Sequence, residues 1–210
     1  WLFLREKDAR TEQERLRKEA DLARANEQML RERAESRGVI SQAAVKLSYG
    51  DTAGAAALLA TVPLDQTQPS LEAANTFRTV GEWHVQDGRW QEAARAFTGL
   101  TDSLISVDPT DSDNVSRNLL NTAAALCQVG DEQAYERFRQ LAISRFGQTT
   151  HPVVAEQIVK STLIRPAGED VLAAARALEM VILKSHERGD TRVSGHRELS
   201  EWSYVALALL

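Results

Sequence analysis

The chain has only one cysteine, Cys127, so no intrachain disulfide can form. No lysine, arginine or histidine flanks Cys127 in its apolar run, which predicts a buried structural thiol rather than a reactive one. A reducing compartment is the simplest interpretation of this cysteine usage, although a single buried thiol is tolerated in either compartment.

Helix breakers and aromatic residues are also scarce. The 210 residues include 5 prolines, and aromatic side chains make up 6% of the chain. Hydrophobic residues nevertheless reach 43%, which is enough to bury a core. Because alanine and leucine are abundant and prolines are few, the composition predicts an all-α fold.

Long hydrophobic runs are missing as well. Trp1 to Leu4 are apolar, but Arg5 and Lys7 follow at once, and a membrane span needs about 20 apolar residues. This start fits the last turn of a membrane helix whose earlier part precedes Trp1. It fits equally well an apolar end that packs in an oligomer, and the residues themselves leave both interpretations open.

No basic cluster is present. The net charge is −5, and residues 1–37 interleave 10 basic with 9 acidic residues. A nucleic-acid surface needs clustered lysine and arginine, so this class of partner is excluded.

What the first 37 residues do contain is a continuous charged helix pattern. One stripe of a heptad repeat is apolar; its members are Ala9, Leu16, Ala23 and Leu30. The companion stripe is weak; its members are Gln13, Ala20, Glu27 and Ala34. The pattern predicts either a solvated stalk or a weak self-association seam, and it favours the stalk.

Glycines divide the rest of the chain. Gly50, Gly88, Gly130 and Gly168 are separated by 38, 42 and 38 residues, which predicts turns between paired helices. Asp51, Ser70 and Asp131 are expected to cap helices. The predicted units are a charged helix over 1–37 and a repeat domain over 38–210, with pairs at about 39–62, 70–105, 114–146 and 152–186 and a terminal helix over 196–210.

The stretch from Phe77 to Phe97 has the spacing of a tetratricopeptide (TPR) repeat. Small residues at Gly81 and Ala93 allow two helices to approach closely, and large residues fill the space beside them. The signature residues are Gly81, Gly88, Trp90, Ala93 and Phe97, with the alanine-to-phenylalanine spacing repeated at Ala134 and Phe138. They predict a right-handed α-solenoid of TPR-like helix-turn-helix repeats.

No catalytic or metal-binding pattern is recognisable. The four histidines, His84, His151, His186 and His196, are scattered, and no two have the i,i+4 spacing of helical metal ligands. His84 is expected to be a buried or half-buried helix residue. We therefore expect no catalytic residue, no metal and no cofactor in this chain.

A binding surface is expected instead on the first helix of each pair, which lines the concave groove of a TPR array. The positions that face this groove by register with Gly81 are Asn75, Arg78, Glu82 and Gln86, and by looser register Arg117, Asn121 and Gln128. Arginine and amide side chains are suited to hydrogen-bond a peptide. Each single position is also compatible with an ordinary solvated polar residue.

An ordered series of segments extends through nearly the whole chain: W-L-F-L-R-E-K at 1–7, Q-A-A-V-K-L at 42–47, V-P-L-D at 62–65, P-S-L-E-A-A at 69–74, F-R-T-V-G-E-W at 77–83, G-R-W-Q-E-A-A at 88–94, Y-E-R-F-R at 135–139 and P-V-V-A-E-Q at 152–157. With these segments the chain resembles the region after the transmembrane helix of large bacterial serine/threonine protein kinases that carry TPR-type repeats. The resemblance implies an upstream cytoplasmic kinase domain, one membrane crossing, and this module on the non-cytoplasmic side of the inner membrane. The kinase's own catalytic motifs are absent from these residues.

Two functions follow as expectations. The first is a non-enzymatic scaffold or sensory module that binds a protein or peptide and is coupled to a membrane-anchored kinase. The alternative is a structural oligomerisation domain that uses the N-terminal helix and the apolar face of residues 202–210. Because that face needs a partner, either the terminal helix caps the array or the natural protein continues beyond Leu210, and we expect continuation.

Overall fold

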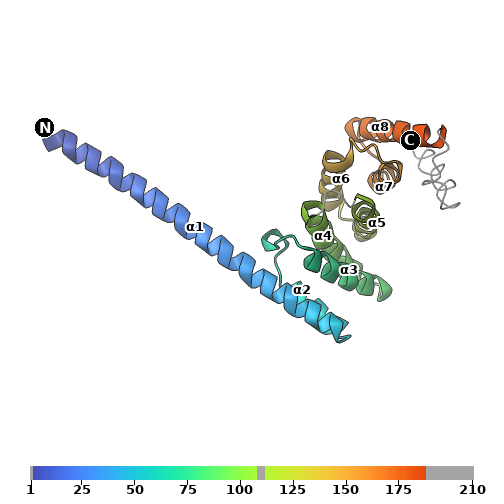
Figure 1. Cartoon of the computed structure of the whole chain (residues 1–210), viewed down its shortest axis with the longest axis horizontal. Coiled ribbons are helices and arrows are strands. Elements are labelled where there is room, and N and C mark those ends of the chain that lie inside the picture. The colour runs from blue at the N-terminus through green and yellow to red at the C-terminus, as the bar shows by residue number, and fades with distance from the viewer. Residues whose placement is uncertain (1, 108–111, 188–210) are drawn as a thin grey trace.

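The structure, a computed structural model, describes residues 2–107 and 112–187 and consists of helices arranged in a curved row (Figure 1). Every regular element in these residues is helical, which confirms the predicted all-α class. The elements are α1 (Leu2–Ser48), α2 (Thr52–Ala60), the short 3₁₀ helix η1 (Leu64–Gln66), α3 (Leu71–Gln86), α4 (Trp90–Val107), α5 (Ser112–Val129), α6 (Glu132–Phe146), α7 (Pro152–Thr162) and α8 (Glu169–Glu187). The predicted terminal helix over 196–210 lies outside the described residues.

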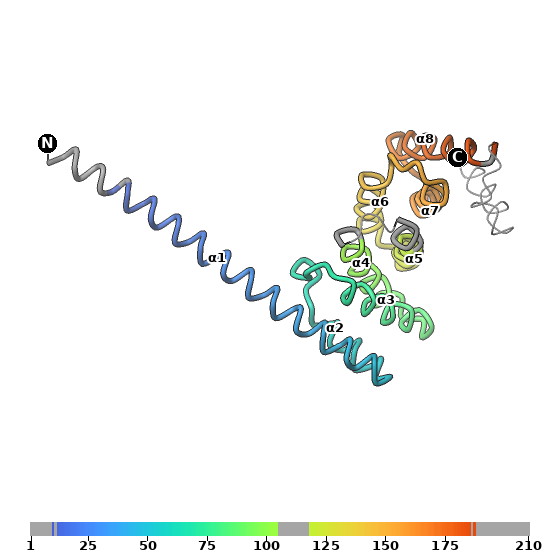
Figure 2. The backbone as a smooth tube through the Cα atoms, viewed as in Figure 1, coloured from blue at the N-terminus to red at the C-terminus, as the bar shows by residue number. Residues whose placement is uncertain are grey.

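Helix α1 passes through Gly38 without a break, so the predicted change of pattern at Gly38 does not end a helix. A glycine inside a helix costs only about 0.5–1 kcal/mol relative to alanine. Burial of Ser36 and Ile40, on either side of Gly38, offsets this cost. The first helix of the pair predicted over 39–62 is therefore the C-terminal end of α1, whose N-terminal part extends away from the other helices (Figure 2).

Three of the four predicted turn glycines have a left-handed backbone, with φ of 79° at Gly50, 70° at Gly88 and 81° at Gly130. In each turn, the residue after the glycine donates its backbone N–H to a carbonyl five residues earlier. At Gly88, for example, the Arg89 N–H donates to the His84 oxygen at 2.8 Å. This is the Schellman arrangement, which ends a helix and turns the chain sharply.

Polar side chains then start the next helices, which confirms the predicted caps. Asp51 accepts from the backbone N–H of Gly54 at 2.8 Å, and Asp131 from that of Ala134 at 2.9 Å. Ser70 caps α3 in the same way through the N–H of Ala73 at 3.0 Å. Each contact satisfies a donor that the first turn of a helix leaves free.

Gly168 does not follow the other three glycines. Its φ is not positive, and it lies immediately before α8, where its carbonyl oxygen accepts from the Leu172 N–H at 3.1 Å. Gly168 thus lies between the two helices of the fourth predicted pair, as expected, but without the left-handed turn of the other three glycines. A longer connection, residues 163–168, joins α7 to α8 and contains Pro166.

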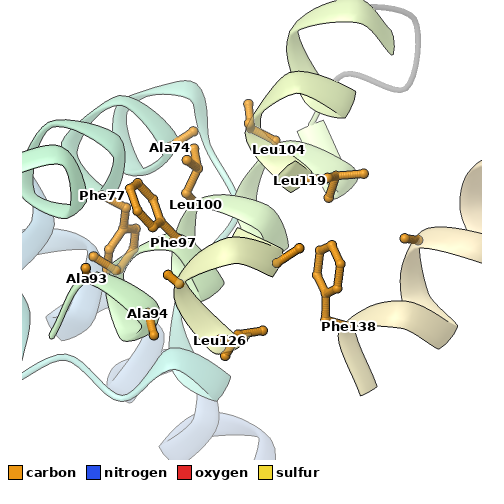
Figure 3. Packing of buried hydrophobic residues seen from close by; sticks show 14 of the residues in the cluster. Ala74, Phe77, Ala93, Ala94, Phe97, Leu100, Leu104, Leu119, Leu126 and Phe138 are labelled. Atoms are coloured by element: carbon orange, nitrogen blue, oxygen red, sulfur yellow. The ribbon is translucent and has the colours of Figure 1, made fainter. Parts of the chain in front are cut away.

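The centre of the core is a reciprocal contact between α3 and α4. A Cβ built on Gly81 would lie 2.6 Å from Cε1 of Phe97, and a Cβ built on Gly99 would lie 2.9 Å from Cε1 of Phe77. Each helix thus has a glycine against which the other packs a phenylalanine, and both rings lie between the two helices (Figure 3). Close approach of two helices requires such small residues at the crossing.

Neighbouring helices then extend this core along the row. Helix α4 packs on both α3 and α5, and α5 also packs on α7. Between α4 and α5, the buried hydroxyls of Thr101 and Thr122 lie 2.8 Å apart, and Thr122 also donates to the Phe97 carbonyl at 3.0 Å. The buried hydrophobic residues from Ile40 to Ile182 form one cluster.

Candidate functional site

The polar stripe predicted on α3 is well defined in the structure. The Ser70 cap fixes where the helix begins, and spacings of three, four and four residues place Asn75, Arg78, Glu82 and Gln86 on one side. The buried residues of α3, Phe77 among them, occupy the opposite side. Asn75, Glu82 and Gln86 are exposed, and Arg78 is half-buried.

Arg78 connects this stripe to α5. Its Nε donates to Asn118 Oδ1 at 3.3 Å, and its Nη1 donates to Asn75 Oδ1 at 3.2 Å. Asn118 itself is buried. The guanidinium group therefore holds polar groups of two helices together at the edge of the core.

Asn118 was not among the predicted groove residues. The loose register had instead selected Arg117, Asn121 and Gln128 on the same helix. Asn121 and Gln128 are exposed, seven residues apart, so they lie on one side of α5, with Asn121 about one turn from Asn118. The side chain of Arg117 lies outside the described residues. Heptad spacing alone does not show which asparagine contacts another helix.

The side chains of this arrangement can form several hydrogen bonds to a ligand. Arg78 has five N–H donors, and Asn75 and Asn121 each have an amide that both donates and accepts. Such groups match the carbonyl, amide and carboxylate groups of a peptide. Glu82 and Gln86 continue the stripe by about one and two turns, so the described part of the surface offers hydrogen bonds along a helix length of about 16 Å.

Cys127 is half-buried, and burial raises the pKa of its thiol. The sequence flanks of Cys127 have no cation, but the fold brings Arg165 and Arg139 near and their charges partly counter the effect of burial. Arg165 donates to the Cys127 carbonyl oxygen at 2.9 Å. These arginines come from more than ten residues away in the sequence, so inspection of the flanks did not reveal them.

Arg139 organises the end of the row. It is buried, its Nη1 pairs with Glu136 at 2.8 Å, and its Nη2 donates to the carbonyl oxygens of Arg165 and Pro166 at 3.1 and 3.2 Å. Its guanidinium carbon lies 4.6 Å from the ring centre of Tyr135. These contacts fasten the long connection before α8 to α6, which gives Arg139 a structural role.

Two of the four histidines are fully described, whereas the side chain of His186 and the whole of His196 lie outside the described residues. His84 is buried at the end of α3, and His151 is exposed just before α7. Across the described ranges, no three His, Cys, Asp or Glu side chains lie close enough together to hold a metal ion. A function without metal or cofactor stays a prediction.

No protein-family model, no curated protein and no solved structure matches this chain. Among the helices described here, none is both long enough and apolar enough to cross a membrane.

Proposed function

We propose that this chain is a non-enzymatic scaffold that binds a protein or peptide on the polar surface of α3 and α5. The surface is defined by the predicted groove residues together with Asn118. In this proposal the helix pairs act as TPR-like repeats of a right-handed solenoid, and the first helices of successive pairs present the surface.

Local features of the repeats support this proposal. The left-handed turns at Gly50, Gly88 and Gly130 have the same hydrogen-bond pattern, and they recur at the intervals expected of repeated helix pairs. The packing of Phe97 on Gly81 supplies the close helix crossing that the TPR pattern requires. A rigid pair of helices is a good base for recognition, because the binding groups lose little conformational freedom when they bind.

The observation that carries the proposal is the Arg78 cluster. The hydrogen bonds from Arg78 to Asn75 and Asn118 use its Nε and Nη1, and Nη2 makes no hydrogen bond within the described part of the chain. The arginine is thus held in place while a donor is still available to a peptide carbonyl or carboxylate. Exposed amides and Glu82 on either side offer further hydrogen bonds that add specificity.

The wider setting is also a proposal, and it depends on the resemblance to bacterial serine/threonine kinases. The charged helix α1 would link the repeats to a membrane helix and a cytoplasmic kinase domain encoded upstream. The module would then sense a protein or peptide on the non-cytoplasmic side of the membrane. The exposed, alternating charges of α1 suit a helix that crosses a water-filled gap.

A displayed library of random twelve-residue peptides tests the binding function. The library is selected on residues 1–210, and enriched peptides are synthesised and titrated by calorimetry. Glu82→Arg is the test variant, because Glu82 is exposed and its charge lies in the middle of the surface. We expect its affinity for the selected peptides to change by about tenfold or more.

Arg176→Glu is the matched control, since Arg176 is exposed on α8, away from the proposed surface. Circular dichroism of both variants checks that the helices remain formed. Selected peptides that bind both variants equally well would show that the surface of α3 and α5 is not the binding site. Failure to enrich any peptide would overturn the proposal.

Self-association is a second candidate function, because large apolar side chains of α1 are exposed. Leu16 is 52% exposed and Leu30 is 62% exposed, and both belong to the predicted heptad stripe. A second copy of α1 would bury these leucines in a coiled coil. This function does not exclude peptide binding, since it uses a different part of the molecule.

A further inference from the structure

A hollow of about 320 Å³ lies between α2, α3 and α4, on a side of α3 different from the polar stripe. Alanines of α2 form one wall, and Phe77, Val80 and Ala96 contribute to the floor. Trp83, His84 and Arg89 line its other end. Most of the lining is therefore apolar; Glu92 and Arg95 are polar as well, and the part with His84 and Arg89 is called the polar end.

The sequence of α2 explains why this space is empty. Thr52–Ala60 reads T-A-G-A-A-A-L-L-A, and its side of the hollow consists of alanine methyl groups and the side chain of Leu59. Ala53, Ala57 and Ala60 line the hollow and are exposed. Larger side chains at these positions would fill the space, as phenylalanines do between α3 and α4.

Two buried nitrogen atoms at the polar end have no partner within the described part of the chain. His84 is only 8% exposed, and its Nδ1 makes no hydrogen bond. Nε of Arg89 is likewise buried and unpaired. Arginine nitrogens only donate, so Arg89 Nε lacks an acceptor. An unsatisfied buried polar group costs about 1–3 kcal/mol, so a ligand that supplied an acceptor to Arg89 Nε would bind favourably here.

Arg89 is positioned by two contacts that leave it adjustable. Its guanidinium carbon lies 3.8 Å from the ring centre of Trp83, and its Nη2 pairs with Asp87 at 2.6 Å. The Arg89 side chain is still 37% exposed. Arg95, one turn into α4, donates to the Val62 carbonyl at 2.6 Å and also lines the hollow. Glu92 is the one acidic residue of the lining, so the lining carries a net positive charge.

We propose that this hollow, hereafter the alanine pocket, binds a small carboxylate with an apolar aromatic or branched body. The apolar body lies against the α2 alanines and the indole of Trp83. The carboxylate supplies the acceptor that Arg89 lacks and pairs with both Arg89 and Arg95. To make this contact, the Arg89 side chain turns partly away from the indole of Trp83. The alanine pocket is separate from the peptide surface, so this proposal does not depend on the proposed function.

The size and charge of the alanine pocket make a neutral or cationic occupant less favourable than a carboxylate. A volume of about 320 Å³ is at the small end of ligand pockets, which suits a molecule of roughly ten heavy atoms. A neutral hydrocarbon would leave Arg89 Nε without an acceptor, and a cation would face two arginines. A carboxylate satisfies both conditions, because charge-assisted hydrogen bonds to arginine are among the stronger ones.

The test uses 3-phenylpropanoate as the probe and 3-phenylpropan-1-ol as its neutral counterpart, each titrated into residues 1–210. Nuclear magnetic resonance follows the indole N–H of Trp83, assigned with Trp83→Phe, and the ring signals of His84. A fragment of this size is expected to bind with a Kd of roughly 1 mM. We expect the signals of both residues to shift when the carboxylate is added. The alcohol should bind at least about fivefold more weakly than the carboxylate.

Two variants locate the binding site. Ala57→Leu fills the pocket from an exposed helix position and should abolish the shifts, whereas Ala173→Leu, an equally exposed alanine on α8, should leave them unchanged. Arg89→Gln should weaken the carboxylate but not the alcohol. Circular dichroism confirms that each variant is folded. The absence of both shifts at about 10 mM probe, tenfold above the expected Kd, would overturn the proposal. It would also be overturned by an alcohol that binds as well as the carboxylate, or by binding of the probe to Ala57→Leu.

Discussion

At the scale of single residues, Gly81 and Gly38 are the same residue type under opposite constraints. A methyl group on Gly81 would lie 2.6 Å from Phe97, whereas one on Gly38 would meet nothing within 4 Å. Both glycines are helical, so alanine gains the same helix propensity at either site. Any difference between the two substitutions therefore measures the packing of Phe97.

We expect Gly38→Ala to stabilise the protein by about 0.5–1 kcal/mol, because it adds helix propensity without a clash. Gly81→Ala should destabilise it by about 1–3 kcal/mol, because the crossing of α3 and α4 must widen. Phe97→Ala should cost about 3–5 kcal/mol. Urea unfolding measures all three, and a loss under about 1 kcal/mol for Phe97→Ala would show that this ring does not fill the crossing.

His84 makes stability depend on pH. Burial, and then the positive charge of Arg89, lowers its pKa below the ordinary value of 6.5, while the carboxylates of Glu92 and Asp87 act in the other direction. The unfolded chain takes up a proton near pH 6.5 that the folded chain does not. The contribution of His84 is therefore fully present above pH 6.5 and is lost as the pH falls toward its lowered value.

Unfolding by urea at several values between about pH 5 and pH 8 tests this coupling. The wild-type chain should lose more stability on acidification than His84→Gln does. His151→Gln, which changes an exposed histidine, is the control for the substitution itself. Equal slopes for the wild type and His84→Gln would show that His84 is protonated to the same extent in both states.

At the scale of helices, local sequence signals predicted where most helices begin and end, whereas which helices pack together depends on tertiary contacts. Gly88 with its neighbours predicted a turn correctly, because a left-handed glycine after a helix is encoded within a few residues. Gly38 shows the limit of such signals, since nothing in the local sequence tells a glycine at the end of a helix from one inside a helix. Element boundaries in the second pair, Ser70 to Val107, were close to the structure for the same local reason.

The candidate site shows the same division. The stripe on α3 follows from helical spacing and the buried position of Gly81, and it needed no tertiary information. The pairing of Arg78 with Asn118 links residues 40 positions apart, and no spacing rule contains it. The alanine pocket was missed for a related reason: a run of alanines predicts a helix, but the space beside it depends on how α2 and α4 are placed.

At the scale of the whole molecule, α1 is much longer than its packing requires. All described side chains of residues 10–31 are exposed, which corresponds to about 33 Å of helix. Ion pairs such as those of Arg15 with Glu12 and Glu19 have side chains more than half exposed, and such surface pairs contribute little. Isolated helices are marginally stable in water, so this part of α1 gains most from a second helix.

Light scattering tests whether a second copy of the chain supplies this second helix. At a protein concentration of about 100 µM, an association with a micromolar Kd would be almost complete. The wild-type chain should have a mass that is a multiple of 23.2 kDa, and the double variant Leu16→Gln/Leu30→Gln should be a monomer. Leu71→Gln is the control, because Leu71 is 57% exposed, close to the 52% of Leu16, but begins α3.

The helical signal separates association through α1 from association elsewhere. If the leucine stripe holds two copies together, the double variant should also lose circular dichroism at 222 nm, since the unpaired part of α1 frays without its partner. If the wild type is a monomer, or if Leu71→Gln dissociates it equally, α1 is a solvated stalk. The proposed peptide surface of α3 and α5 would then be the remaining candidate.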